Sequence, residues 1–206
     1  MIKGIDISSW QGSNVDFKRV KNSGVEFVIL RAGGSDGKFF TDPTYYRNYE
    51  MAKKEGLHIG AYYIVGKNCK SAESGLFDAQ RFEQIIKNTR LDYPVYIDFE
   101  LPDRSNKQGN TDACFTFCNY MELCGYYAGI YASDISGFKD RLYSDQLTMF
   151  DKWVARYGGE PSYINKYGIW QFTSKGQIDG INGNVDVDVS KNDYSKIIRE
   201  NHLNGF

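Results

Sequence analysis

The stretch Tyr93-Pro94-Val95-Tyr96-Ile97-Asp98-Phe99-Glu100 places two acids in a run that is otherwise β-branched or aromatic. With a proline at its start and another just after it, this run predicts one short β-strand. Residues two apart on a strand face the same way, so Asp98 and Glu100 are expected on one face, about 7 Å apart at the backbone. Their proximity should raise the pKa of one carboxyl and leave the other ionised, which suits general acid and base chemistry. The alternative is a solvated strand end whose acids only face water.

The composition indicates one large domain and argues against two classes of partner. The chain has 206 residues, of which 41% are hydrophobic and 16% aromatic, ample for a single core. Its net charge is −1 and it has no long basic run, so we expect no nucleic-acid partner. No stretch approaches about eighteen apolar residues, so we expect no membrane insertion. Nothing in the sequence points to an obligate protein partner.

Strand-like and helix-like segments alternate along the chain. We expect eight strands, at residues 3–8, 27–32, 58–65, 93–100, 127–132, 152–157, 167–173 and 185–189. About five helices are expected between them, at residues 15–22, 42–56, 72–89, 111–123 and 135–142. Asp42 and Thr111 are the predicted N-caps of two of these helices.

This alternation predicts an α/β fold with a parallel sheet. Eight such strands can close into an irregular, flattened (β/α) barrel, here without outer helices between the last three strands. Residues 1–190 are expected to form this barrel. Residues 191–206 are expected to form a C-terminal helical tail, with one short helix around 194–199.

Four acids are expected at one face of the barrel. The C-terminal ends of parallel strands gather functional groups at one mouth. Asp6 ends the first strand, Asp98 and Glu100 end the fourth, and Asp186 lies in the eighth. The first and eighth strands become neighbours when the barrel closes, so Asp6 and Asp186 should lie close together. The fourth strand lies across the barrel and becomes reachable if the barrel is flattened.

The order of these motifs resembles the glycoside hydrolase family 25 lysozymes, the N-acetylmuramidases of phage endolysins and bacterial autolysins. The resemblance covers the chain from Gly4 to about Val189. It is carried by Gly4-Ile5-Asp6-Ile7-Ser8-Ser9-Trp10-Gln11-Gly12, Phe27-Val28-Ile29-Leu30-Arg31-Ala32, Gly60-Ala61-Tyr62-Tyr63, Tyr96-Ile97-Asp98-Phe99-Glu100, Gly129-Ile130-Tyr131, Trp153-Val154-Ala155, Trp170-Gln171-Phe172-Thr173-Ser174 and Val185-Asp186. Two positions depart from the family pattern, Tyr63 where His is frequent and Asp188 where Asn is more usual. Both departures bear on local substrate contacts.

The resemblance implies hydrolysis of the β-1,4 bond between N-acetylmuramic acid and N-acetylglucosamine in bacterial peptidoglycan, with no metal and no cofactor. It implies that Glu100 protonates the leaving sugar oxygen, that Asp98 is its partner, and that Asp6 and Asp186 complete the acidic base of the groove. We favour a substrate-assisted route with retention, in which Asp98 orients the 2-acetamido nitrogen of the muramic sugar.

A sugar platform with polar edges is expected around these acids. Its predicted members are Tyr62, Tyr131, Trp153, Trp170 and Gln171, and each of these aromatics has core packing as its alternative. Arg31 is expected to orient an acid at the mouth.

Two other functions stay open on the sequence alone. A strand-borne Asp-x-Glu with two further acids is also how a divalent-metal nuclease or phosphatase holds its ions, although no basic cluster for a phosphate is present. A cell-wall lectin without turnover would keep the same groove. The acid at position 6 interrupts any leader-like apolar run at the start, so we expect synthesis in the cytoplasm and action on the wall after release.

Overall fold

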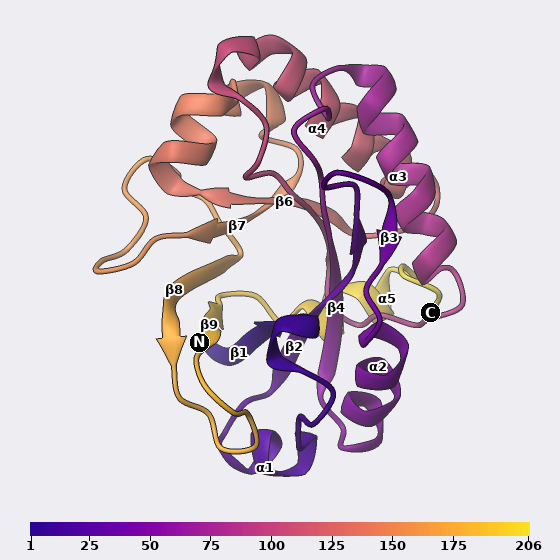
Figure 1. The fold of residues 1–206 in the computed structure, drawn as a ribbon, viewed down its shortest axis with the longest axis vertical. Helices are drawn as coiled ribbons and strands as arrows, with labels where there is room; N and C mark the ends of the chain where they lie inside the picture. Colours follow the sequence, from indigo (N-terminus) through magenta and orange to yellow (C-terminus); the bar gives the residue numbers. More distant parts are fainter.

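The computed structural model describes residues 1–206, in which eight strands close into a barrel (Figure 1). One sheet of nine strands runs in the order β1-β9-β8-β7-β6-β5-β4-β2-β3, and pairing of β1 with β2 closes the ring. The ninth strand, β3 (Phe40–Thr41), is a two-residue segment that pairs only with β2 outside the ring. The predicted eight-stranded α/β barrel is therefore confirmed.

Along the chain, α-helices alternate with the strands from β1 to β6 and are absent between the last three strands. The remaining strands are β1 (Ile2–Ile7), β2 (Phe27–Gly34), β4 (His58–Ile64), β5 (Val95–Asp98), β6 (Ala128–Ser133), β7 (Asp151–Ala155), β8 (Ile169–Gly176) and β9 (Val185–Ser190). The α-helices are α1 (Phe17–Asn22), α2 (Tyr45–Lys54), α3 (Ala72–Ile86), α4 (Lys107–Leu123) and α5 (Tyr194–Glu200). In Figure 1, α1 to α4 lie outside one part of the ring, whereas only loops lie beside β8. The expected absence of outer helices between the last three strands is confirmed.

The last strand runs opposite to its neighbours, which corrects the expectation of a wholly parallel sheet. β9 is antiparallel to both β1 and β8, while the other strands of the ring pair in parallel. The connection between β8 and β9 is residues 177–184. A crossover to a parallel neighbour needs about a dozen residues or more, so this connection can only turn the chain back.

Three predicted boundaries were wrong because tertiary contacts override local signals. Helix α2 starts at Tyr45 with Thr44 as its N-cap, and the carboxylate of Asp42 accepts from the Thr44 N–H and from Arg31. Helix α4 starts at Lys107, so Thr111 lies inside it and donates to the Lys107 carbonyl at 2.8 Å. Strand β5 ends at Asp98, two residues before Glu100.

Two apolar clusters hold the barrel. The larger one lies between the strands and the outer helices, and the smaller one fills the barrel interior with mostly aromatic side chains, Phe27, Ile29, Tyr62, Tyr93, Tyr96, Trp153, Ile169, Tyr194 and Ile198. Room for these rings comes partly from Gly4, where a Cβ atom would lie only 2.2 Å from Cζ of Phe27. Tyr194 and Ile198 belong to α5, so the C-terminal tail closes the barrel floor.

Candidate active site

Five carboxyl groups gather at the barrel mouth, and four of them were predicted from the sequence. Asp6 lies near the end of β1 and Asp98 ends β5. Asp186 and Asp188 lie on β9, and Asp6 is the register partner of Asp186. Each of the five carries a pKa shift, and neighbours among the five contribute to the shifts of Asp6, Asp98, Glu100 and Asp188.

Asp186 reaches the mouth only because β9 is reversed. It is the second residue of β9, and in a parallel strand that end would lie at the barrel floor. The antiparallel pairing instead puts the beginning of β9 beside the end of β1. The prediction that Asp6 and Asp186 lie close together is therefore confirmed, through a strand direction that the sequence analysis did not foresee.

Asp98 and Glu100 have different surroundings. The Asp98 side chain is 5% exposed, and its Oδ1 atom has no hydrogen-bond partner. Glu100 lies beyond the strand and is exposed at the mouth. The chain between them stays extended because the Phe99 N–H donates to the Tyr131 carbonyl at 2.9 Å. Glu100 is therefore the acid that a bound substrate can meet directly, and Asp98 lies deeper.

The expected split between one raised and one ordinary pKa is not found. Burial, and then the charge of Glu100, raises the pKa of Asp98 well above its usual value, while Arg31 opposes this. Partial burial, and then the charge of Asp186, raises the pKa of Glu100, while Arg141 opposes this. The pKa values of both members of the pair are therefore raised, because desolvation acts on both.

Gln171 organises the floor of the mouth. The hydroxyls of Tyr131 and Tyr157 donate to its Oε1 atom at 2.9 and 2.8 Å. Its Nε2 atom donates to Asp6 Oδ2 at 2.8 Å. Since two donors fix the carbonyl end of the amide, the amino end is held toward Asp6.

The predicted aromatic platform is only partly assembled at the surface. Trp153 is 1% exposed and packs beneath Tyr62 and Tyr131, so its place is under the floor. Trp170 precedes the inward-facing Gln171 on β8 and therefore points to the other face of the sheet. Its indole N–H donates to the Arg156 carbonyl at 2.8 Å. Tyr62 and Tyr131 remain at the mouth itself, with Tyr131 partly exposed.

At the mouth, Arg31 donates its hydrogen bonds to other residues of the protein. Its Nε atom donates to Asp42 Oδ2 at 2.7 Å and its Nη2 atom to Ser9 Oγ at 2.8 Å. The Ser9 N–H also donates to Asp42. This arrangement holds the loop after β1, and the Arg31 charge opposes the rise in the pKa of Asp98.

Three further residues belong to the mouth and were absent from the predicted site. Asp188 is completely buried beside Asp6, and Tyr157 follows β7 and binds Gln171. Trp10, which is 86% exposed, stands on the loop that Arg31 holds. A search for polar and aromatic residues at or just after the end of each predicted strand would have found Trp10 and Tyr157.

The acids do not form a metal centre. No group of three or more His, Cys, Asp or Glu side chains in the chain is arranged to hold a metal ion.

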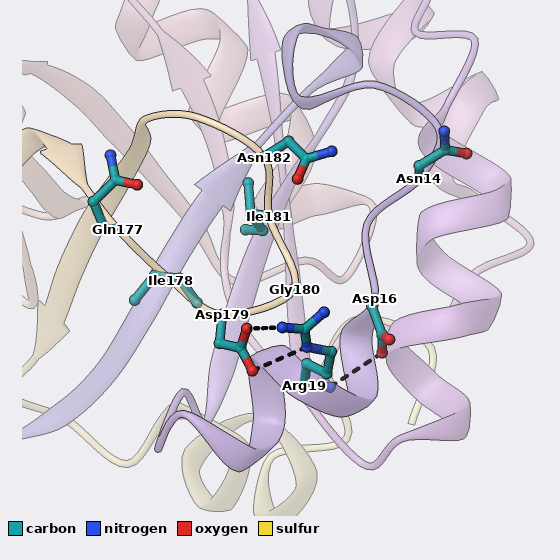
Figure 2. Close-up of a pocket in the computed structure, with 9 residues that line it drawn as sticks. All are labelled: Asn14, Asp16, Arg19, Gln177, Ile178, Asp179, Gly180, Ile181 and Asn182. Carbon is teal, nitrogen blue, oxygen red and sulfur yellow. Dashed lines mark hydrogen bonds and ion pairs between the residues drawn. The ribbon is translucent and has the colours of Figure 1, made fainter.

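A polar hollow outside the mouth carries no comparable chemistry. Figure 2 shows it between the start of α1 and the loop of residues 177–182. Its charged groups pair with one another, as Arg19 Nε donates to Asp179 at 3.0 Å and the Arg19 N–H to Asp16 at 3.1 Å. None of the five mouth acids lines it.

The barrel and its carboxyl-lined mouth define a hydrolase of the acid/base type. The family model of the glycosyl hydrolases family 25 matches residues 5–181, and the chain belongs to this family. No helix in it is long and apolar enough to cross a membrane.

Relatives of known type agree with this assignment. The autolytic lysozyme of Clostridium acetobutylicum is 34% identical over 188 residues, which cover 91% of this chain and 55% of that protein. The structure of the CTP1L endolysin is similar with a TM-score of 0.82 and 31% identity, covering 97% of this chain and 70% of that one. The autolysin LytC of Streptococcus pneumoniae, solved in complex with a synthetic peptidoglycan ligand, gives a TM-score of 0.78 at 27% identity, covering 91% of this chain and 46% of that one. The chain thus spans about half the length of two of these relatives.

Proposed function

We propose that this chain hydrolyses the β-1,4 bond between N-acetylmuramic acid and N-acetylglucosamine in peptidoglycan, with Glu100 as the general acid. The observation that carries the proposal is the pairing of an exposed Glu100, whose pKa is raised, with a buried Asp98 at the end of β5. Family membership and the peptidoglycan ligand bound to LytC support the choice of substrate.

In the first step Glu100 gives its proton to the glycosidic oxygen as the bond from that oxygen to the anomeric carbon breaks. The carbonyl oxygen of the 2-acetamido group forms a bond to the anomeric carbon from the opposite side. Asp98 accepts a hydrogen bond from the acetamido N–H, and its ionised form stabilises the positive charge that develops. Binding of this N–H would favour the ionised form of Asp98, as the Arg31 charge already does.

In the second step water attacks the anomeric carbon and the bond to the acetamido oxygen breaks. The Glu100 carboxylate takes the proton from this water and is ready for another turnover. Because the anomeric carbon is inverted twice, the product keeps the β configuration. Asp6 and Asp186 keep the floor of the groove negative, which favours the same developing charge.

Mass spectrometry of digested peptidoglycan tests the proposal. After purified walls are digested and the new ends are reduced with borohydride, we expect reduced muramic acid at those ends. Reduced glucosamine ends would indicate a glucosaminidase, and free peptides an amidase. Loss of turbidity should persist in EDTA, and loss of activity in EDTA would instead support a metal-dependent enzyme.

The stereochemical course is tested separately by NMR of a soluble glycan digest at early times. The β anomer is expected to appear first and then equilibrate. If the α anomer appears first, retention and the substrate-assisted route are excluded, while the assignment of the bond would stand.

A further inference from the structure

We infer that Asp188 and Asp6 share a single proton, so that the pair carries one negative charge and Asp188 acts as a positioning residue for Asp6. This inference rests on the proposed function for its catalytic meaning, although the shared proton itself can be measured without activity. Asp188 does not reach the surface, so it acts on a substrate only through Asp6.

Burial makes an ionised Asp188 costly. The residue is 0% exposed, its Oδ1 atom accepts one hydrogen bond, from the Trp153 indole at 2.8 Å, and its Oδ2 atom has no donor at all. A buried carboxylate is stable only when its lone pairs are paired with donors or cations. With one neutral donor, Asp188 lacks that compensation.

Asp6 lies on the same face of the sheet as Asp188. Asp188 faces Gly4 on β1, two residues before Asp6, and it faces Gln171 on β8. Alternate residues of a strand share a face, so the two carboxyls are diagonal neighbours across the β1–β9 pair and can contact each other. Ionised carboxylates are acceptors only, so this contact is a hydrogen bond only when one of the two carries a proton.

The donors of the protein around the pair leave Asp188 Oδ2 without a partner. One N–H of Gln171 Nε2 donates to Asp6, and the Gln171 carbonyl accepts from Tyr131 and Tyr157. Trp153 has no second N–H to give. The hydrogen-bond network therefore lacks one donor between Asp6 and Asp188, and a proton on the pair supplies it.

The charges around the pair favour this proton. From β9 Asp186 acts on both carboxyls, and from β5 Asp98 acts on Asp6; β7 and β8 present the neutral Trp153 and Gln171. The other titratable groups around the pair are the hydroxyls of Tyr62, Tyr131 and Tyr157, whose pKa values are raised, so that they are neutral over this range. The cation of the mouth, Arg31, is paired with Asp42. Burial, and to a lesser degree Asp186, raises the pKa of Asp188 to about 8, and burial and Asp188 raise that of Asp6.

A shared proton predicts a specific dependence of stability on pH. Between pH 5 and 7 the folded pair holds a proton that both residues have lost in the unfolded chain. The ratio of unfolded to folded wild-type protein should therefore rise about tenfold per pH unit relative to a variant that lacks this proton. The variant Asp188→Asn keeps the size of the side chain and a donor for Asp6, but it has no proton to share.

Urea unfolding at pH 5 to 7 of wild type, Asp188→Asn, Asp6→Asn and the double variant tests the inference. In wild type the ratio of unfolded to folded protein should rise about tenfold more steeply per pH unit than in any of the three variants. The loss of this slope should be the same in each single variant and in the double variant. An unchanged slope in Asp188→Asn would overturn the inference, because the proton would then belong to Asp6 alone. A double variant that loses twice the slope would also overturn it, because the two residues would then hold separate protons.

The three tryptophans provide a second readout that needs no variant to fold. In a ¹H–¹⁵N spectrum the Trp153 indole signal should shift with pH in a titration centred near 8, because its acceptor is Asp188. The chemical shifts of the other two indoles should not change over this range. Trp170 donates to a backbone carbonyl, and Trp10 is exposed. A shift of equal size at all three would mean a global change and contradict the assignment.

Activity then tests the positioning role. Asp188→Asn should clear walls at least about tenfold faster than Asp188→Ala, which removes the donor to Asp6. Equal activity of the two variants would contradict the role of Asp188 in placing Asp6. If wild type itself is inactive on walls, the proposed function fails while the unfolding and NMR results still decide the shared proton.

Discussion

Asp6 and Asp186 face each other across the β1–β9 pair, one near the end of its strand and the other near the beginning of its own. The antiparallel direction of β9 thus brings an acid from the far end of the sequence to the catalytic face. Its charge acts on Glu100, since Asp186 is the main charged group that raises the pKa of that residue.

Replacing Asp186 by Asn should move the alkaline limb of activity to lower pH. Without the Asp186 charge the pKa of Glu100 falls toward its ordinary value, so Glu100 loses its catalytic proton earlier as pH rises. The measurement is kcat/KM on a soluble glycan as a function of pH. Asp179→Asn is the matched control on the β8–β9 loop, since the exposed Asp179 pairs with Arg19 and should leave the profile in place. An identical profile for Asp186→Asn would disprove the coupling.

Replacing Glu100 by Gln should lower kcat by about 10²- to 10⁴-fold, because the amide cannot protonate the leaving oxygen. Glu100 is exposed, so the fold should tolerate the change. The test is the rate of wall clearing, together with the fraction of the variant that sediments with walls. Retained binding with lost turnover supports the general acid, whereas clearing at the parental rate would remove Glu100 from the mechanism.

Replacing Arg31 by Ala should lower the free energy of unfolding by about 3 kcal/mol. The change leaves the carboxylate of Asp42, which has no exposed surface, without its cation, although Thr44 and Ser9 still donate to it. Urea unfolding at pH 7 gives the value. Arg19→Ala breaks an ion pair whose partners are both exposed and should change nothing measurable. Equal effects of the two variants would mean that the Arg31 pair does not hold the mouth.

Replacing Asp92 by Asn should remove part of the acid sensitivity of the fold. Burial alone would raise the pKa of Asp92, but hydrogen bonds from His58, Arg199 and the Ile59 N–H lower it to about 2. The stability that this gives is present above pH 4 and is lost as pH falls toward 2. The variant should therefore be less stable than wild type by at most about 2 kcal/mol at pH 7 and equal to it near pH 2. Urea unfolding at both pH values tests this, and a constant difference between the proteins would contradict it.

The barrel could be predicted because its strands are local signals. Each is a short β-branched or aromatic run with turn residues at its ends, and alternation with amphipathic helices implies the ring. The direction of β9 could also have been predicted, since the residues between it and β8 are too few for a parallel crossover. The wrong prediction came from extending the parallel direction of the earlier strands to β9.

Side-chain roles at the mouth were harder to predict, because they depend on depth and on distant partners. Asp42 has the sequence of a helix cap, and one of its oxygens accepts from the Thr44 N–H, but the other forms a buried ion pair with Arg31 that the sequence does not reveal. Trp153 faces the mouth side of the barrel but lies one layer too deep to meet a ligand. The pKa values of Asp98 and Glu100 are both raised mainly by burial, which their spacing in the sequence does not reveal.

The reversed direction of β9 also separates a segment that can vary in length from the acids that must keep their places. Because β8 arrives at the mouth and β9 departs from it, residues 177–184 begin and end on the same rim. Such a rim segment can gain or lose residues without shifting any rung of the ring, as loop insertions are thermodynamically tolerated. Variation in glycan preference among enzymes of this architecture can therefore accumulate in that hairpin while the acids beneath it keep their places.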